Sequence, residues 1–326
     1  MNLMDTNLVQ KKEKLFLTII RWAGTLLSLG VMIFLLSRVG WRQALDSFGQ
    51  IPWWTFFIFI LLGLVSRFST WGRWHSLLRA SDEPIDPKDS LKLTFAGLFA
   101  SNVLPTTIGG DVFRLAGAVR VGISAALAAA SLVVDRLVGM AGMLLALPLA
   151  LKFLPILRET ASPAEMGLVA RTGILAKFRA WLQRNIRSTF QALKKWLKKP
   201  ANLARALGFT LTHQACIYLI IKIFVNAMGE DISFLSIAGI WSLTYFITLL
   251  PISINGLGLQ EVTVTNLFTA WGEISIGTSL ALAIFLRILW MLVSLPGAFF
   301  VGDILAGKRP TEQAEQNTMT VEKQQK

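Results

Sequence analysis

Long apolar runs separated by short polar segments dominate the chain. They predict helices at residues 15–37, 51–72, 92–109, 123–151, 203–227, 232–251, 255–272 and 274–302. Because about 20 apolar residues are needed to cross the hydrocarbon core of a bilayer, most of these runs could be spans. The pattern predicts an all-α integral membrane protein with about eight transmembrane helices. Residues 15–305 form one polytopic domain in this interpretation, between a short N-terminus (1–14) and a polar, disordered tail (306–326).

Two apolar regions are interrupted by proline and glycine. The first contains Asn-Val-Leu-Pro-Thr-Thr-Ile-Gly-Gly-Asp-Val-Phe-Arg at 102–114, and a partial repeat of it begins 146 positions later, at Leu250. Lipid cannot hydrogen-bond a broken backbone, so such segments must be buried in protein or line a wet cavity. The short segments 92–109 and 255–272 either cross fully or re-enter as hairpins. Paired interruptions of this kind point to a transport-type binding site.

Composition supports the membrane assignment. Hydrophobic residues make up 54% of the chain, charged residues only 16%, and the mean hydropathy is +0.57. A net charge of +13 would suggest nucleic acid for a soluble protein. Here the basic residues lie mostly between spans, so orientation and anionic lipid explain them better, and we expect no nucleic-acid partner. The single cysteine, Cys216, forms no disulfide framework or cysteine metal site within this chain, and no cofactor is expected.

The loop at 152–202 predicts the orientation. From Lys152 to Arg205 there are twelve basic residues and two acidic ones, whereas Glu230-Asp231 carries no base. The positive-inside rule then places this loop and both termini in the cytoplasm of a cell inner membrane. Apolar residues including Trp181 and Trp196 recur at helical spacing among the loop's cations. This pattern is typical of an interfacial helix on anionic headgroups. The charges either only set topology or also form a dedicated lipid or partner site.

Charged residues inside the predicted spans are candidate functional groups. Arg136, next to Asp135, and Arg287 lie near the middle of long apolar runs, where an arginine costs at least ~2.5 kcal/mol. Such residues should face the bundle interior and have partners. Asp135 and Arg136 are poor partners for each other, because adjacent helix positions diverge by about 100°. We expect a neutral network in which three carboxylates meet three cations, with the arginines lining one polar cavity: Asp111, Asp135, Glu261, Arg114, Arg136 and Arg287.

The interrupted segments could add backbone donors to this network. A helix that begins at Gly109-Gly110 or after Asn255-Gly256 would direct its free N–H groups and positive dipole end at an anion. A nearby arginine would match the geometry of phosphate. The alternatives are a simple kink, and ion pairs that only hold helices together. The predicted substrate-binding residues are Gly109, Gly110, Asp111, Arg114, Asp135, Arg136, Asn255, Gly256, Gly258, Glu261 and Arg287.

Three features together resemble one family. The run from Asn102 to Arg120, the Asp135-Arg136 pair and the segment at 250–261 are similar to the flippase-like membrane domain of lysylphosphatidylglycerol synthases, over about residues 12 to 305. Family members often have glutamate where Asp135 stands. The resemblance implies movement of aminoacylated phospholipid between leaflets, although standalone relatives accompany the synthesis of polyprenyl-linked sugars or other lipids. Since the chain ends some twenty residues after its last predicted span, we expect it to lack the family's soluble aminoacyl-transfer domain.

The sequence favours a transporter over an enzyme. It shows no Ser-His-Asp set, metal cluster or P-loop, and its two histidines, His75 and His213, are 138 positions apart. We expect His75 at a surface or membrane interface and His213 in packing or a polar contact. The first hypothesis is translocation or handling of an anionic or aminoacylated phospholipid or a polyprenyl-linked lipid. The alternative is a membrane scaffold subunit for a separate lipid-modifying enzyme. A catalytic membrane enzyme is a third hypothesis, for which the sequence offers no base–nucleophile pair.

Overall fold

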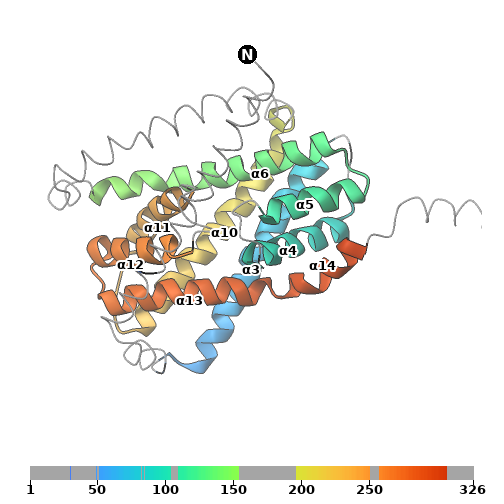
Figure 1. The fold of residues 1–326 in the computed structure, drawn as a ribbon. Coiled ribbons are helices and arrows are strands. Elements are labelled where there is room, and N and C mark those ends of the chain that lie inside the picture. Colours follow the sequence, from blue (N-terminus) through green and yellow to red (C-terminus); the bar gives the residue numbers. More distant parts are fainter. Residues whose placement is uncertain are drawn as a thin grey trace, which may run out of the picture.

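The computed structural model describes residues 51–81, 85–103, 109–153, 196–249 and 257–306, together with positions 30, 49 and 83. Helices and short turns make up this part of the chain, which contains no β-strand (Figure 1). The long helices are α3 (Trp53–Arg79), α6 (Ala125–Ala146, continued by the 3-10 helix η1, Leu147–Phe153), α10 (Pro200–Ala227) and α13 (Ile276–Ser294). The shorter helices are α4 (Pro87–Val103), α5 (Gly109–Arg120), α11 (Phe234–Thr248), α12 (Leu259–Gly272) and α14 (Pro296–Ala306). The predicted all-α fold is confirmed.

Four helices among the described residues are long and apolar enough to cross a membrane. They are α3, α6 with its extension to Leu151, α10 and α13. They confirm the predicted spans at 51–72, 123–151 and 203–227 and most of the one at 274–302, which Pro296 divides from α14. The predicted span at 15–37, the N-terminus 1–14 and the tail beyond Ala306 lie outside the described residues.

The first interrupted region is a helical hairpin. Leu93 of α4 lies against Gly117 of α5, and Gly97 against Arg114, so the two helices are antiparallel. Their close approach requires glycine at position 110, since a Cβ there would lie only 2.0 Å from the Ser101 hydroxyl. With 17 and 12 residues, the arms are about 18 to 26 Å long. Both arms are shorter than the ~30 Å hydrocarbon core, so the hairpin favours the re-entrant alternative for 92–109 over a full crossing.

The second interrupted region has the same construction. α11 and α12 have 15 and 14 residues and pack on each other on either side of the break. Gly258 begins α12 with φ of 76°, a left-handed backbone conformation that favours glycine. The predicted spans at 232–251 and 255–272 are therefore the two arms of one hairpin. Asn255 and Gly256 lie outside the described residues.

The helices form two units of the same order, α3–α4–α5–α6 and α10–α11–α12–α13. Corresponding helices have 27 and 28, 17 and 15, 12 and 14, and 22 and 19 residues. Along the α3–α10 contact, Phe59 packs on Phe224, Ser66 on His213, and the Leu77 carbonyl accepts from Trp196. These pairings make α3 and α10 antiparallel. The second unit is therefore inverted relative to the first, and the two hairpins lie at opposite ends of the bundle (Figure 1).

Equivalent contacts close the base of each hairpin. The carboxylate of Glu83, in the turn before α4, accepts a 2.6 Å hydrogen bond from the backbone N–H of Ser124, the N-cap residue of α6. In the second unit Glu230 accepts a 2.7 Å bond from the backbone N–H of Ser275, the N-cap residue of α13. Each glutamate thus joins the chain entering a hairpin to the chain leaving it. This agreement supports the assignment of two inverted repeats.

The relative direction of α6 and α10 corrects the predicted placement of the loop at 152–202. α6 and α10 run parallel, since Val134 and Ala206 share an apolar cluster and Gly142, further along α6, lies against Thr210 and Gln214. The end of η1 and the start of α10 therefore lie at opposite ends of the bundle. The prediction that 152–202 forms a loop on one cytoplasmic face is wrong for its two ends. Residues 154–195 themselves lie outside the described part of the chain.

Two residues of the predicted interfacial helix, Trp196 and Leu197, fall within the described part, and Leu197 is exposed. Trp196 is only 2% exposed, and its indole N–H donates to the carbonyl of Leu77, 2.9 Å away. It packs inside the protein, against the end of α3, instead of facing lipid headgroups. The prediction is therefore wrong for this residue, because the carbonyls at the end of α3 satisfy its indole within the bundle.

Candidate functional site

Five charged side chains from three helices meet beside the first hairpin. Arg73 of α3 binds Asp135 of α6 through two hydrogen bonds, Nε–Oδ1 of 2.7 Å and Nη2–Oδ2 of 3.2 Å. Arg136 donates from Nε to Asp111 Oδ2 at 2.6 Å. Arg114 Nη1 lies between the two carboxylates, 3.3 Å from Asp111 Oδ1 and 3.4 Å from Asp135 Oδ2. These residues are called the arginine cluster.

The arginine cluster carries one more positive charge than its carboxylates neutralise. Three guanidinium groups face two carboxylates, and the extra donors belong to Arg114. Its side chain is 7% exposed, and its Nε and Nη2 find no hydrogen-bond partner among the described residues. Its guanidinium lies 4.1 Å from the centre of the Trp74 ring, which stabilises the cation without using its N–H groups. A buried cation with two unpaired donors is suited to bind one anionic group.

The first hairpin positions Arg114 and Asp111. Asp111 lies in the first turn of α5, where the positive end of the helix dipole stabilises a carboxylate. Arg114 follows one turn later on the same face, and the lack of a side chain at Gly97 makes room for its stem. A Cβ at Gly97 would lie 2.6 Å from Arg114 Cγ. Arg136, at 46% exposed, is the most accessible side chain of the arginine cluster and marks its open side.

The second unit has a simpler version of this arrangement. Glu261, in the first turn of α12, accepts from Arg287 Nε of α13 at 2.6 Å, as Asp111 accepts from Arg136. Its second oxygen accepts from the backbone N–H of Gly258 at 2.8 Å. Ile220 of α10 stands at the position that corresponds to Arg73 in the first unit, and Leu286 of α13 at the position that corresponds to Asp135. The second unit therefore has a balanced ion pair in place of a cluster with excess charge.

The structure groups the predicted site residues into two sets. It brings Asp111, Arg114, Asp135 and Arg136 together, with Gly109 and Gly110 at the start of α5. Arg287 instead pairs with Glu261 beside Gly258, in the second unit. The expectation of one cavity lined by all three arginines is therefore not met by these contacts.

Sequence reasoning missed Arg73. It lies just beyond the predicted end of the span at residue 72, whereas α3 continues to Arg79 and buries it against Asp135. The only signal in the sequence was that Asp135, a mid-span carboxylate, needed a partner other than the adjacent Arg136; nothing indicated which cation it would be. Of the histidines, His213 makes the expected polar contact, 2.7 Å from the Ser66 hydroxyl. His75 is half-buried, 2.9 Å from Ser90 and stacked on Trp71.

The ion pair between Arg287 and Glu261 gives a first prediction. Because the pair is balanced, we expect it to hold α12 to α13, and replacing Arg287 alone by leucine should destabilise the protein by ~3–5 kcal/mol. Adding Glu261→Gln should restore the unfolding temperature, since glutamine keeps an oxygen for Gly258. Thermal unfolding of the purified variants measures both effects. A double variant as unstable as Arg287→Leu alone would show that Arg287 stabilises the protein through more than this pair.

Comparison with known protein families agrees with the motif-based resemblance. A search of curated proteins found no match to this chain. The family model described as "Lysylphosphatidylglycerol synthase TM region" matches residues 21–297, which include every described helix from α3 to α13. The protein is therefore a multi-pass membrane protein that belongs to the lysylphosphatidylglycerol synthase transmembrane family.

Proposed function

We propose that the protein binds the anionic headgroup of a membrane lipid at the arginine cluster and moves that lipid across the bilayer. The observation that carries this proposal is Arg114, a buried cation with two unpaired N–H groups inside a cluster of net positive charge. Phosphate accepts parallel hydrogen bonds from a guanidinium edge. The shared chemistry is a phosphate ester, which both phospholipids and polyprenyl-linked lipids carry.

The inverted repeats support transport over static binding. In many transporters, inverted units enclose a substrate site near the middle of the membrane, with broken helices directing their ends at the substrate. Here the arginine cluster lies where the first hairpin meets α3 and α6. The Tyr245 side chain of α11, from the other unit, lies close enough to interact electrostatically with Arg73 and Asp135. A group bound there would therefore lie near the second unit as well as the first.

We also propose an orientation in the cell inner membrane. The end of the bundle where α3 finishes and α10 begins carries Arg79, Lys88, Arg120, Lys198 and Lys199. The positive-inside rule places this end in the cytoplasm. The opposite end, with Glu230 and Asp231, then faces outward, and the end of α14 faces inward. This keeps the predicted cytoplasmic C-terminus while allowing the two ends of 152–202 to lie on different faces.

Reconstitution tests the function. Purified protein in vesicles of phosphatidylcholine should move headgroup-labelled phosphatidylglycerol between leaflets faster than protein-free vesicles do. Labelled phosphatidylcholine, whose headgroup has no net charge, serves as the matched substrate and should move less. If no phosphate-bearing anionic lipid moves unless a second protein is added, the scaffold hypothesis is correct. A polyprenyl phosphate added in a parallel arm distinguishes the two lipid sources.

A further inference from the structure

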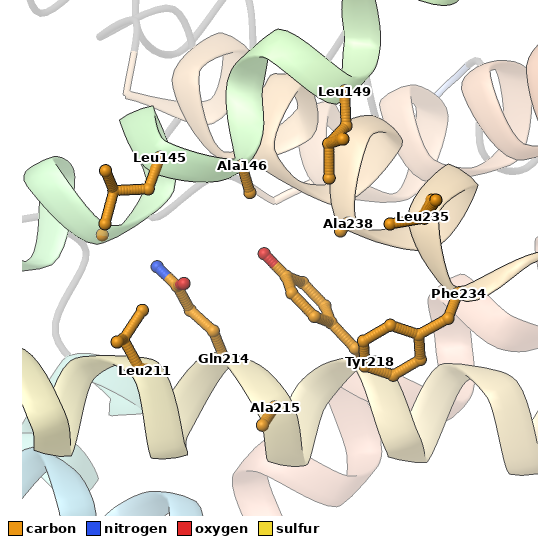
Figure 2. A pocket seen from close by; sticks show the side chains of 11 residues that line it. Leu145, Ala146, Leu149, Leu211, Gln214, Ala215, Tyr218, Phe234, Leu235 and Ala238 are labelled. Atoms are coloured by element: carbon orange, nitrogen blue, oxygen red, sulfur yellow. The ribbon is translucent and has the colours of Figure 1, made fainter.

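A second candidate site begins about two turns along α6 from Asp135 and Arg136 of the arginine cluster. A groove of about 290 Å³ runs between α6, α10 and α11, and nearly all the atoms that line it are apolar. Its lining side chains include Leu145, Leu149, Gln214, Tyr218 and Leu235, drawn in Figure 2. This space is at the small end of the volumes that hold drug-sized ligands. It suits one hydrocarbon chain better than a whole lipid.

The groove opens toward the membrane. Three of its rim residues, Leu145, Leu211 and Leu235, are 64%, 44% and 59% exposed. All three belong to apolar helices, α6, α10 and α11, so in a bilayer their exposed faces meet lipid tails. A lipid can therefore place a chain in the groove sideways, from within its own leaflet.

Gln214 gives the groove a specific chemical feature. It lies halfway along α10 and is 3% exposed, and its Nε2 has no hydrogen-bond partner within the described part of the chain. Figure 2 shows its amide, and beside it the Tyr218 hydroxyl, directed into the groove toward α6. The Tyr218 hydroxyl has Ser242 as a polar neighbour, but it makes no well-aligned hydrogen bond among the described residues. Leaving a buried donor unpaired costs ~1–3 kcal/mol, so an occupant that accepts a hydrogen bond is favoured here.

Two glycines connect the groove to the arginine cluster. The Arg73 guanidinium lies against Gly139, where a Cβ would be 3.0 Å from Nη1. The Gln214 amide lies against Gly142, on the same face of α6, where a Cβ would be 2.7 Å from Nε2. Three residues along a helix cover about 4.5 Å. The Gln214 amide and the Arg73 guanidinium of the arginine cluster therefore contact neighbouring turns of one face of α6.

We propose that the α6–α10–α11 groove holds one ester-linked acyl chain of a glycerophospholipid, with Gln214 donating a hydrogen bond to the ester carbonyl. The inference rests on the proposed function, because it assumes that the headgroup of the same lipid is bound at the arginine cluster. It selects a glycerolipid among the candidate lipids. The hydrocarbon chain of a polyprenyl lipid has no carbonyl for Gln214.

Photo-crosslinking tests the inference without measuring transport. The full chain is placed in bilayer discs with phosphatidylglycerol that carries a photoreactive group on one chain, in ester-linked or ether-linked form. After illumination, labelled peptides are identified by mass spectrometry. Peptides containing Leu145, Leu149 and Leu235 should carry about three- to tenfold more ester than ether lipid, the value of one neutral hydrogen bond. Gln214→Leu should reduce ester labelling to the ether level.

Two comparisons distinguish the loss of ester binding from a loss of folding. Asn266→Leu removes an exposed amide from α12 and should leave labelling unchanged. Gln214→Leu should unfold at the same or a higher temperature than the wild-type protein, because it removes an unpartnered buried amide. If Gln214→Leu does not fold, Gly142→Ala, whose methyl displaces the amide, replaces it and should reduce ester labelling in the same way.

Several outcomes would overturn the inference. They are equal labelling by ester and ether lipids, undiminished ester labelling in folded Gln214→Leu, absence of label in the groove, and equally strong labelling by a photoreactive polyprenyl phosphate. Occupancy is measured here, whereas the proposed function is tested by movement between leaflets. A labelled groove in a protein that moves no lipid would refute transport and leave the groove assignment standing.

Discussion

Replacing Arg114 by glutamine should slow transport of an anionic phospholipid by about 10- to 100-fold while the protein stays folded. Arg114 offers two donor atoms, Nε and Nη2, and the glutamine amide can replace one of them. The loss of one hydrogen bond to a charged group, ~1.5–3 kcal/mol, corresponds to this slowing. Folding should survive because Asp135 keeps Arg73 and Asp111 keeps Arg136. The measurement is the leaflet-transfer rate of labelled phosphatidylglycerol, with the unfolding temperature determined on the same sample.

Arg120→Gln is the matched control for this prediction. Arg120 belongs to the same helix, is exposed, and binds the carbonyl of Ile304 in α14. Its loss should change transport less than twofold if the effect at Arg114 reflects anion binding and not loss of charge in general. Arg114→Lys should give an intermediate rate, because lysine keeps the charge but not the planar edge. Wild-type transport by folded Arg114→Gln protein would place the headgroup site elsewhere.

Replacing Asp135 by asparagine should have the largest effect on stability, a loss of ~3–5 kcal/mol. Asp135 is 3% exposed and is the only carboxylate that binds both Arg73 and Arg114 in the described structure. Without its charge, two neighbouring guanidinium groups face each other across a buried space with one remaining carboxylate, Asp111. Unfolding in denaturing micelles measures the loss.

Two further variants separate this mechanism from a general effect of charge. Asp231→Asn removes a carboxylate that is 81% exposed and paired with Lys222, and should leave the free energy of unfolding nearly unchanged, because solvent screens an exposed pair. The double variant Arg73→Leu, Asp135→Leu should recover most of the stability, because it removes the buried pair as a unit. Failure of the double variant to recover would mean that Asp135 contributes through more than its pairing with Arg73.

The sequence identified the charged residues of the site better than it identified their partners. Asp111, Arg114, Asp135, Arg136, Glu261 and Arg287 all make ion pairs, as expected for charges within apolar segments. Local geometry also showed correctly that adjacent Asp135 and Arg136 do not pair. The partners come from other helices, however, and their approach depends on how the units pack. The bond between Arg73 and Asp135 and the separation of Arg287 from Arg114 could not be predicted from spacing.

The long spans were predictable, whereas the path of the chain was not. Length and apolar composition identify α3, α6, α10 and α13, because a bilayer requires both. A Pro/Gly interruption shows that a helix breaks but not that the chain turns back, so arms of one hairpin resemble separate spans. Counting basic residues in a loop assumes that both loop ends lie on one face. That assumption fails here, because α6 and α10 pack parallel at Gly142 and the two ends of the loop therefore lie at opposite ends of the bundle.

Glu230 makes the base of the second hairpin sensitive to acid. It lies at the opposite end of the bundle from Glu83, at the base of the first hairpin. Partial burial alone would raise the pKa of Glu230, but its hydrogen bonds from Ser275 and Thr278 outweigh burial and lower that pKa below the ordinary value of 4.5. The stabilisation from this contact is therefore complete above about pH 4.5 and is lost only as the pH falls through the lowered value. Strong acid at this end of the bundle would therefore loosen the contact that joins the chain entering the second hairpin to the chain leaving it.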